Sequence, residues 1–474
     1  MTPEFYKFGD FLFSAWNDAA QGDTLHLSAG ITAKDVKNLS SFLPELKAPY
    51  VLAVTAGKEI RIDAGAILRL MAVAGDTQAG LVYSDYLVKK GTGYLPRPLL
   101  DYQPGSIRDS FNFGDVLLFS TSAIKEVLKK YGKLPHDPGL AFYDLRLKIS
   151  LQYSLIHIPE FLYAVVVRRD IPAKRGNKTP EDHFAYVARR NAQRQKQMEK
   201  IATGYLKLAG AYLPPRIKKA GKTNVSFPLQ ASIVIPVLNR KRTIRDALLS
   251  ALSQETTFDF NIIVVDNHST DGTTRIVQRL ARQYPKIRHH IPARRDLNIG
   301  GCWNEAIYSA CCGRYAVQLD SDDLYSSPHV LQKIIDVFEE KNCAMVVGSY
   351  TIVNERLQTI PPGLIDHREW TAANGHNNAL RINGLGAPRA FNTAILRKVG
   401  FPNVGYGEDY AAALRITREY EIGRIYSSLY LCRRWTDNTD AALSVEKQNS
   451  YDAYKDKLRT LEIKARQIMN KKEA

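Results

Sequence analysis

Three strongly apolar segments, each ending in polar residues and each followed by a helical pattern, constrain the fold of the second half of this chain. The segments are ASIVIPVLN, FNIIVVDN and RYAVQLDSDD, which begin at Ala231, Phe260 and Arg314. Strands that alternate with helices indicate a parallel, doubly wound α/β sheet. Because ligands bind at the carboxyl ends of the strands in such sheets, we expect the polar residues at 236–240, 266–271 and 320–323 to meet at one edge.

Length and composition limit the classes of protein to which the chain can belong. A chain of 474 residues with 45% hydrophobic residues has room for two or three domains and is not mainly disordered. The net charge of +17 suggests a partner that carries phosphates; the alternative is that the charge only keeps the protein soluble. The N-terminus lacks the pattern of a secretory signal, no run of eighteen apolar residues occurs, and the five cysteines lack metal-binding spacing. We therefore expect a cytoplasmic protein.

The charge is concentrated in one segment. Between Ile171 and Lys222 the sequence has thirteen Lys and Arg against three Asp and Glu. The stretch from Glu181 to Leu213 lacks proline and has apolar residues at helical spacing, so it predicts a helix that ends before Pro214. It is either a solvated connector between two domains or a surface that contacts anionic lipid at the inner membrane face.

The two halves of the chain resemble each other. PYVLAVTAGKEI from Pro49 corresponds to RYAVQLDSDDLY from Arg314, FSTSAIKEV from Phe119 to FNTAILRKV from Phe391, and IPEFLYAVVVRR from Ile158 to IYSSLYLCRRW from Ile425. The order is the same in both halves, and this predicts tandem homologous domains. The first copy has Lys58 where the second has Asp323, and a cation site cannot make that exchange. We expect the first copy to be a non-catalytic scaffold.

These observations divide the chain into four parts. Residues 1–170 form the degenerate domain, 171–229 the basic helical connector, 230–440 the catalytic domain and 441–474 a C-terminal helix. In the catalytic domain, the carboxylates of DSDD at the end of an apolar strand could hold a hard divalent cation through oxygen ligands. The alternative is an Asp-rich turn that caps the following helix.

The motifs SIVIPVLN, VVDNHSTDG, NIGGCWNEA, LDSDD and GEDY, in this order, resemble the family 2 glycosyltransferases of GT-A fold. The two-copy layout is similar to bacterial transferases with a degenerate N-terminal GT-A-like copy. The resemblance implies an inverting transfer of a sugar from a nucleotide-sugar, usually a UDP-sugar, with Mg²⁺ or Mn²⁺. The acceptor would be a glycan, lipid-linked or protein hydroxyl. No nucleic-acid recognition signature occurs, so no nucleic-acid partner is expected.

The resemblance also implies roles for single residues. The donor nucleotide would be bound by Pro236, Asn239, Asp266, Asn267, Asn298, Gly300, Asn304 and Asp320. Asp320 and Asp322 would be the D-x-D pair at the ribose and the metal, with Asp323 as the competing metal ligand because the register of the acidic run is ambiguous. Asp409 would be the general base, and Glu408 would orient it or bind acceptor hydroxyls.

Chemical reasoning supports these roles and adds others. A carboxylate at the start of the apolar-striped helix after Gly407 is favoured in its ionised form, as a base requires, although an N-capping Asp is the alternative. Arg433 or Arg434 could hold the diphosphate through forked hydrogen bonds. The irregular segment 367–391 suits the acceptor, with Trp370 as a stacking platform and with Asn383 and Gly384 nearby. Many relatives carry a metal-binding His near Trp435, and this sequence has none there.

Two functions follow from the sequence. The first is a metal-dependent inverting glycosyltransferase, and the second is a non-catalytic scaffold that binds a nucleotide-sugar or a glycan. The complete acidic motifs of the second copy favour the first.

Overall fold

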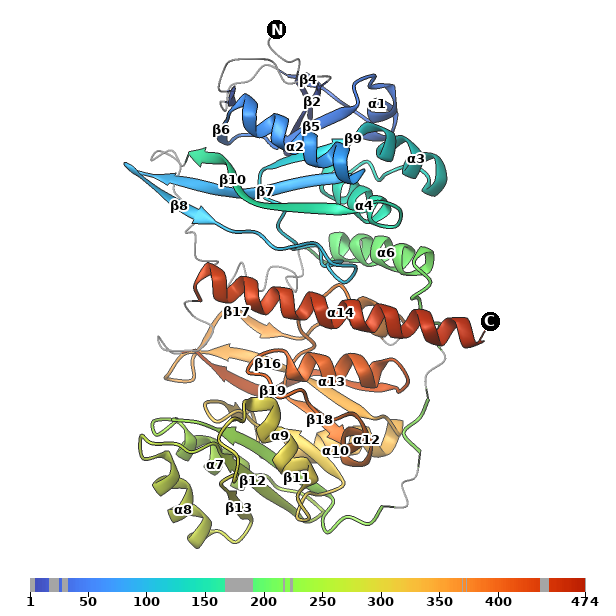
Figure 1. Ribbon diagram of the computed structural model, residues 1–474. Coiled ribbons are helices and arrows are strands. Elements are labelled where there is room, and N and C mark those ends of the chain that lie inside the picture. The colour runs from blue at the N-terminus through green and yellow to red at the C-terminus, as the bar shows by residue number, and fades with distance from the viewer. Residues whose placement is uncertain are drawn as a thin grey trace. The chain divides into compact units, whose positions relative to one another are not determined.

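The computed structural model describes residues 5–16, 25–27, 33–166, 191–215, 218–221, 225–368, 370–371, 373–434 and 443–473. The chain forms two compact units (Figure 1). Unit 1 comprises Met1–Asn177, Arg194–Tyr212 and Leu443–Ala474, and unit 2 comprises Lys178–Gln193 and Leu213–Ala442. The C-terminal segment therefore belongs to the same unit as the N-terminal segment.

Unit 2 is a mixed α/β unit around a nine-stranded sheet. Its elements are β11 Ala231–Val237, α7 Ile244–Leu252, β12 Phe260–Asp266, α8 Thr273–Gln283, β13 Ile287–His290, α9 Ile299–Tyr308, β14 Tyr315–Gln318, β15 Leu324–Tyr325, α10 Val330–Lys341, β16 Met345–Val353, β17 Thr359–Ile365, α11 Gly375–Asn378, β18 Arg389–Asn392, α12 Thr393–Val399, α13 Glu408–Thr417 and β19 Ile422–Arg433. The strand order is β13-β12-β11-β14-β18-β16-β19-β15, and β17 pairs with β16.

The predicted α/β architecture is confirmed, and parallel pairing dominates its leading half. Strands β13, β12, β11 and β14 are parallel neighbours, as the alternation of strands and helices predicts. Beyond β14 the sheet is mixed, because β18 runs antiparallel to both of its neighbours and β17 forms a hairpin with β16. The hairpin needs no crossover helix, so the sequence signal for a parallel sheet is absent there.

The first strands of unit 2 are apolar because they are covered on both faces. Residues of β11 and β12 are buried along nearly their whole length. On one face, Ile233 and Val264 pack in a cluster with Leu248 of α7 and Ile334 of α10. Helix α9 contacts both strands and lies outside that cluster. A strand that is buried on both faces has apolar residues at successive positions, without the alternation of apolar and polar residues in a half-exposed strand. These strands therefore appear in the sequence as continuous apolar runs.

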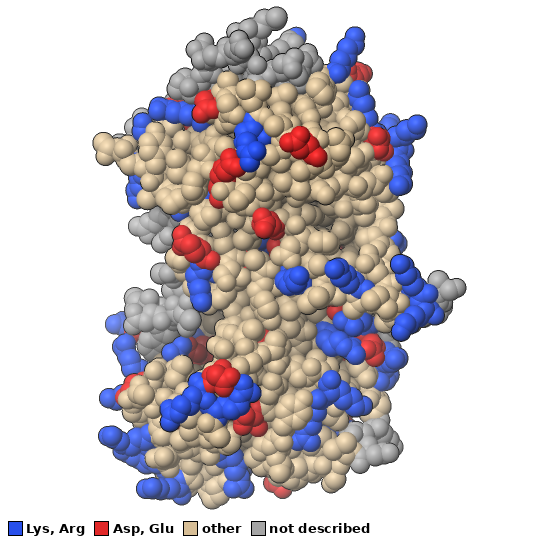
Figure 2. Space-filling view, viewed as in Figure 1, with Lys and Arg blue, Asp and Glu red and all other residues tan. Residues whose placement is uncertain are grey.

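The outer face of α8 is basic. Arg275, Arg279 and Arg282 lie at helical spacing, are exposed and line a shallow depression. Figure 2 shows Lys and Arg side chains gathered over the α8 edge of unit 2, at the lower left. The stretch from Gly272 to Arg295 holds seven Lys and Arg and no Asp or Glu. Helix α8 itself therefore carries three positive side chains and no acidic one.

Unit 1 is built around a ten-stranded sheet. Its elements are β1 Tyr6–Phe8, β2 Phe11–Trp16, β3 Leu25–Leu27, β4 Lys34–Asp35, α1 Leu39–Glu45, β5 Tyr50–Thr55, β6 Glu59–Ile62, α2 Ala64–Thr77, β7 Leu81–Lys90, β8 Gly93–Arg97, β9 Val116–Ser120, α3 Thr121–Tyr131, α4 Pro138–Ser150, β10 Leu155–Val166, α6 Ala192–Leu208 and α14 Val445–Glu473. The order is β3-β6-β10-β7-β9-β5-β2-β1-β4, with β8 on β7. Most of its pairs are antiparallel, unlike the parallel sheet that the sequence predicted.

The internal repeat of the sequence is present in the strand order. The run β10-β7-β9-β5 in unit 1 corresponds to β19-β16-β18-β14 in unit 2, with the same directions at each pair. Phe119 pairs with Val51 and Leu81, and Phe391 pairs with Ala316 and Met345. The two units therefore share a four-stranded centre, as tandem homologous domains require.

Unit 1 lacks the acidic cluster at the corresponding strand end. Lys58 follows β5, and its ammonium lies 2.6 Å from Oδ1 of Asp115. A positive charge with its own internal partner stands where unit 2 has Asp323, so this strand end offers no set of free carboxylates.

The predicted connector helix differs from α6 in extent and environment. Helix α6 ends at Leu208 rather than Leu213, and the first ten residues of the predicted helix, 181–190, lie outside the described residues. Met198, Ala202 and Tyr205 are buried in unit 1, so this helix is part of a folded unit and not a solvated link. Lys218 and Lys219 pair with Glu419 and Glu421 at 3.6 and 2.5 Å, which reduces the free positive charge of the segment.

The C-terminal helix α14 closes unit 1 through buried charge. Asp456 is fully buried and accepts hydrogen bonds from Arg108 Nε at 3.1 Å and Arg459 Nη1 at 2.7 Å. A Cβ on Gly105 would lie 2.2 Å from the Asp456 carbonyl oxygen, so only glycine allows this approach. Helix α14 is thus an integral element of unit 1.

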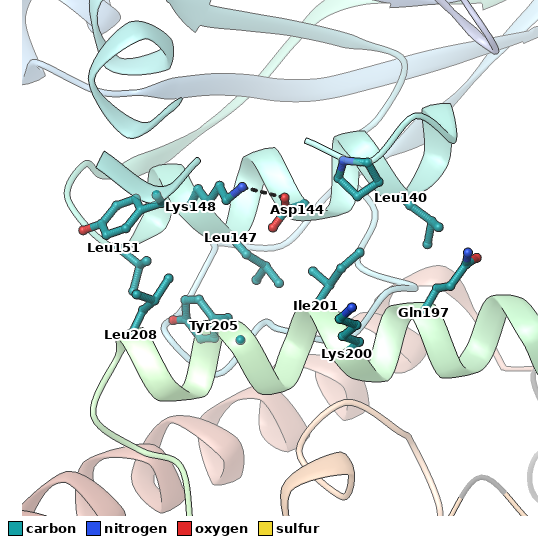
Figure 3. A pocket seen from close by; sticks show the side chains of 13 residues that line it. Leu140, Asp144, Leu147, Lys148, Leu151, Gln197, Lys200, Ile201, Tyr205 and Leu208 are labelled. Carbon is teal, nitrogen blue, oxygen red and sulfur yellow. Dashed lines mark hydrogen bonds and ion pairs between the residues drawn. The ribbon is translucent and has the colours of Figure 1, made fainter. Parts of the chain in front are cut away.

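A cavity of about 400 Å³ lies between α4 and α6 in unit 1 (Figure 3). Its walls are largely apolar, with Leu147 and Ile201 facing each other, and one polar feature is the ion pair between Lys148 Nζ and Asp144 Oδ2 at 2.7 Å. Among the described residues, no helix is long and apolar enough to cross a membrane.

Candidate functional site

The carboxyl ends of β11 and β12 are tied together by their loops. Val237 and Asp266 are paired at the last position of the two strands. Asn239 has a φ of +53°, which an Asn side chain tolerates better than most, and its Oδ1 accepts a hydrogen bond from Thr270 N at 2.8 Å. Its backbone N donates to Ser269 Oγ at 3.0 Å. Of the predicted donor residues, Pro236 thus lies near the end of β11, and Asn239 lies on the loop that follows it at the sheet edge.

Asp266 supports these loops from inside. The residue is fully buried, and its carboxylate accepts hydrogen bonds from Ser269 N at 3.0 Å and Thr274 Oγ1 at 2.6 Å. Burial alone would raise its pKa, but the hydrogen bonds from His289, Thr274 and Ser269 outweigh it and lower the pKa below its usual range. In this conformation Asp266 orders the loop and faces no solvent, contrary to the expected direct contact with a donor.

Asn267 is the half-buried neighbour of Asp266. Its Nδ2 donates to the Leu297 carbonyl at 2.8 Å, and its Oδ1 is buried without a hydrogen-bond partner in the described structure. The free acceptor keeps Asn267 compatible with the expected donor contact.

The acidic run after β14 divides into two kinds of carboxylate. Asp320 and Asp322 are half-buried, and Asp323 is buried with its Oδ1 accepting a hydrogen bond from Arg433 N at 2.8 Å. Burial, with the charges of Asp322 and Asp320, raises the pKa of Asp323 well above its usual range. The sequence leaves open which two of the three carboxylates form the D-x-D pair. Burial favours Asp320 and Asp322, because both are accessible while Asp323 is hydrogen-bonded to the Arg433 backbone.

Asp320 and Asp322 lie close enough to influence each other. Burial, followed by the charge of Asp320, raises the pKa of Asp322. Partial compensation comes from Arg240, whose Nε lies 3.7 Å from Asp322 Oδ2, and from Gln318, whose Nε2 donates to both oxygens of Asp320 at 2.9 and 3.0 Å. Two adjacent carboxylates with incomplete compensation are suitable oxygen donors for a divalent cation.

The described residues do not form a complete metal coordination sphere. Within the described ranges, no group of three or more His, Cys, Asp or Glu is arranged to hold a metal ion. Asp323, the competing metal ligand, accepts a hydrogen bond from the Arg433 backbone N through Oδ1. A cation at Asp320 and Asp322 would need further oxygen ligands, which the phosphates of a bound nucleotide can supply.

Arg433 is committed to the fold rather than exposed for a diphosphate. Its side chain is 4% exposed, its Nε donates to the Asp322 carbonyl at 2.5 Å and its Nη1 lies 3.1 Å from Asp246 Oδ2. The residue therefore braces the acidic loop against α7, contrary to the predicted diphosphate contact. Arg434 is half-buried, with its backbone N bonded to the Val353 carbonyl, and Trp435 lies outside the described residues.

The GED motif begins a helix, as predicted. Helix α13 starts at Glu408, after Gly407 with a φ of +82°, and carries Asp409 in its first turn. Asp409 is half-buried, with Oδ2 at 2.8 Å from Arg389 Nη1 and Oδ1 accepting from Tyr410 N at 2.7 Å. The positive end of the helix dipole and Arg389 both favour the ionised carboxylate.

Glu408 differs from its neighbour. It is buried, and burial together with the charge of Asp409 raises its pKa to about 8, so it carries a proton at neutral pH. Its burial leaves little surface for an acceptor hydroxyl, and both expected roles of Glu408 stay predictions. The two carboxyl groups of the motif thus have different protonation states.

Helix α9 shapes the site indirectly. A Cβ on Gly300 would lie 1.9 Å from the Pro402 carbonyl oxygen and 3.0 Å from Glu408 Cβ. Asn304 clamps the same loop, because its Nδ2 donates to the Phe401 carbonyl at 2.8 Å and its Oδ1 accepts from Phe401 N at 2.9 Å. Gly300 and Asn304 therefore position the loop before α13, and their contact with a donor stays a prediction.

Asn298 remains an exposed residue at the start of α9. It is the N-cap, without a side-chain capping bond, and its backbone N donates to Asn403 Oδ1 at 2.7 Å. Its side chain is thus available for the expected donor contact.

The acceptor segment is more ordered than its composition suggests. Trp370 is 3% exposed, and its indole packs so closely on Gly375 that a Cβ there would lie 2.4 Å from Nε1. A buried indole cannot be the predicted stacking platform in this conformation. Asn383 and Gly384 are half-buried and remain accessible candidates.

Two residues that the sequence analysis missed connect the halves of the site. Arg389, the first residue of β18, contacts Asp409, and Gln318, the last residue of β14, contacts Asp320. Their neighbouring positions come from the pairing of β14 with β18, which are about seventy residues apart in the chain. An Arg at the end of an irregular polar segment was the only sequence signal for this contact.

Comparison with known proteins identifies the class to which this site belongs. Residues 232–401 match the family model Glycosyl transferase family 2, and this part of the chain is a family 2 glycosyltransferase domain. The resemblance recognised in the motifs is thereby confirmed.

Individual relatives match between 28% and 49% of the chain. An uncharacterized glycosyltransferase of Nostoc sp. is 32% identical over 133 residues, which are 28% of this chain and 40% of the relative. The poly(ribitol-phosphate) beta-glucosyltransferase of Bacillus spizizenii is 26% identical over 238 residues, covering 48% of this chain and 36% of the relative. The crystal structure of S. aureus TarS 1-349 with UDP-GlcNAc is 20% identical, with a TM-score of 0.40, and covers 49% of this chain and 66% of that one. The chain thus spans less than half the length of these two curated relatives.

Proposed function

We propose that the protein is an inverting glycosyltransferase that moves a sugar from a nucleotide-sugar, most simply a UDP-sugar, to a hydroxyl of a glycan, lipid-linked or protein acceptor. The observation that carries the proposal is the pairing of β14 with β18. Contacts across this pairing link Asp320 to Asp409 through Gln318 and Arg389, and Asp322 lies two residues from Asp320 in the same acidic run. A family 2 glycosyltransferase domain supports the same conclusion.

The reaction needs one base and one stabiliser of negative charge. The acceptor oxygen bonds to the anomeric carbon from the face opposite the diphosphate, its proton passes to a carboxylate oxygen of Asp409, and the nucleoside diphosphate leaves with the electron pair of the broken bond. Asp409 is half-buried beside Arg389, whose positive charge favours the ionised carboxylate that a base requires. Glu408 is protonated and does not compete for the proton.

We propose Mg²⁺ or Mn²⁺ as the cofactor, held by Asp320 and Asp322 and by the donor phosphates. The ion would stabilise the negative charge that develops on the leaving diphosphate. Asp323 and Arg433 support this pair by holding the acidic loop in place.

The test uses Asp409→Asn, Asp322→Ala and the wild type. We expect both variants to lose transfer of radiolabelled sugar from a panel of nucleotide-sugars to extracted acceptors by at least about 100-fold, because base catalysis alone contributes on that scale. Only Asp322→Ala should also lose the metal-dependent rise in melting temperature with donor. Full transfer in both variants would refute the proposal, and donor binding without turnover in the wild type would favour a non-catalytic scaffold.

Unit 1 is proposed to be a scaffold without transferase activity. The ion pair of Lys58 with Asp115 at the strand end that corresponds to the acidic loop supports this assignment. Replacement of Lys58 by Met is expected to leave turnover unchanged, and a large loss would contradict a purely structural role for this strand end.

We further propose that the basic face of α8, defined by Arg275, Arg279 and Arg282, contacts an anionic membrane surface from the cytoplasmic side. Charge complementarity supports this surface over Lys218 and Lys219, which already have acidic partners. Near an anionic bilayer each Arg contributes about 1 kcal/mol, so three contribute roughly a 100-fold change in partitioning.

The proposal is tested by sedimentation with phosphatidylglycerol vesicles. R275E/R279E/R282E is expected to abolish binding, whereas the charge-matched control K333E/R356E/K398E retains it. Equal binding of both triple variants, or no binding of the wild type to these vesicles at low salt, would refute the membrane contact.

A further inference from the structure

A continuous chain of contacts connects the proposed donor side of the site to the proposed base. Gln318 Nε2 donates to both oxygens of Asp320, and Gln318 Oε1 accepts from Arg389 N at 3.1 Å. Arg389 Nη1 then lies 2.8 Å from Asp409 Oδ2. Each contact joins a different element, from the end of β14 through β18 to the start of α13.

The chain is held rigidly at its centre. Gln318 is 3% exposed, and its carbonyl accepts from Tyr325 Oη at 2.9 Å. Its side-chain amide has one possible orientation, because the carboxylate needs a donor and the Arg389 N–H needs an acceptor. The Arg389 side chain is 19% exposed, and its Nη1 also donates to the Gly386 carbonyl at 2.9 Å. Neither side chain can turn away without breaking two contacts.

The charges explain why Arg389 is needed here. The charges of Asp409 and Asp320 both act on its guanidinium and favour its positive form. Arg389 brings a positive charge to Asp409, and it lies on β18, which pairs with β14, the strand that precedes Asp320. An Arg in this place can hold the base at a constant distance from the donor carboxylates while their charges repel each other.

We propose that Arg389 is a positioning residue that orients the Asp409 carboxylate for proton abstraction, and that Gln318 fixes Arg389 relative to Asp320. This inference rests on the proposed function of the site, because it concerns the geometry of that base. Arg389 acts through Asp409 and takes no proton itself. Misplacement of a catalytic group by about 1 Å reduces turnover by about 100-fold, which sets the expected scale of the effect.

The first test separates turnover from binding. Arg389→Gln is expected to lower kcat by about 30- to 100-fold and to change KM for the donor by less than about 3-fold, since it removes orientation rather than donor contacts. Arg389→Lys keeps the charge without the fork and should recover part of kcat. Gln318→Leu should resemble Arg389→Gln and also raise the donor KM, because it frees Asp320. The control is Arg415→Gln, which breaks the 2.5 Å ion pair between Arg415 of α13 and Glu419, two residues beyond the end of that helix, and should leave kcat unchanged.

A double-mutant cycle decides whether Arg389 acts through the base. In an Asp409→Asn background, Arg389→Gln should cause no further loss, because the group it orients is already absent. Additive losses, or an unchanged kcat in Arg389→Gln with a wild-type melting temperature, would overturn the inference while leaving the proposed function intact. If Asp409→Asn itself transfers sugar at the wild-type rate, the proposed function fails instead. A melting temperature for every variant distinguishes these results from unfolding.

Discussion

Replacement of Gly300 by Ala tests whether the loop before α13 controls the site. Gly300 lies within α9, where Ala would ordinarily stabilise a helix by about 1 kcal/mol relative to Gly. Here the added Cβ would lie 1.9 Å from the Pro402 carbonyl oxygen, and a backbone atom cannot move aside as a flexible side chain can. Overpacking of this kind costs about 1–3 kcal/mol, so the clash should outweigh the helical gain.

The chain contains matched controls for this substitution. A Cβ on Gly204 in α6 would meet nothing within 4 Å, and a Cβ on Gly301 would meet the ends of the Asn403 and Leu297 side chains at 2.5 and 2.8 Å. We therefore expect Gly204→Ala to stabilise the protein slightly, Gly301→Ala to be intermediate and Gly300→Ala to destabilise it. The spread in melting temperature should be roughly 2–4 °C for each kcal/mol in a unit of this size.

Urea unfolding and turnover are measured on the same three variants. Gly300→Ala should also lower kcat, because the displaced loop carries Glu408 and Asp409 with it. The donor should still raise the melting temperature of this variant, since Asp320 and Asp322 are not displaced. Equal stability and turnover of Gly300→Ala and Gly204→Ala would refute the reasoning.

Three further predictions follow from charged groups in unit 2. Asp266 has a lowered pKa in the folded state, so its stabilising contribution is present above its unfolded pKa of about 4 and is lost as the pH falls further. Asp266→Asn should therefore unfold more easily than the wild type in urea at pH 7, and its stability should lack this acid dependence. Glu408 has a pKa of about 8 in the folded state, so the folded protein binds one more proton than the unfolded protein between about pH 4 and 8, and its stability falls as the pH rises through that range. Glu408→Gln should remove this fall. A difference in unfolding free energy between the variant and the wild type that stays constant from pH 5 to 9 would contradict the prediction. Arg433→Met should destabilise the protein by about 3 kcal/mol in urea, because it leaves the buried Asp322 carbonyl without its donor, and a wild-type midpoint would contradict the bracing role.

The sequence predicted the part of unit 2 in which strands and helices alternate, because each of these elements has a local hydrophobic pattern. The apolar runs of β11, β12 and β14 and the helices between them follow from their sequence, and the structure has them as parallel neighbours. The repeat between Phe119 and Phe391 likewise predicted equal strand order in the two units, and the registers agree. Pairing beyond β14 was not predictable in this way, because hairpins and inserted strands leave no regular spacing.

The candidate site was predicted by residue type and corrected by burial. A motif identifies Asp266, Trp370 and Arg433 as polar or aromatic residues near a strand end, but it does not tell which way their side chains face. The structure buries all three and gives them partners within the protein. Gly300 and Asn304 were expected to touch a donor, and the structure shows in addition that they hold a loop, whose residues lie about one hundred positions away in the chain.

The sequence by itself determined the class of this protein, the α/β alternation, the internal repeat and the acidic residues at the ends of β14 and the start of α13. These features depend on local pattern and composition, which are present in the chain before it folds. Only the tertiary structure decided that Asp320 and Asp322 are accessible while Asp323 is not, and that Gln318 and Arg389 join Asp320 to Asp409. Burial and contact between distant strands arise from packing, and no spacing along the chain records them.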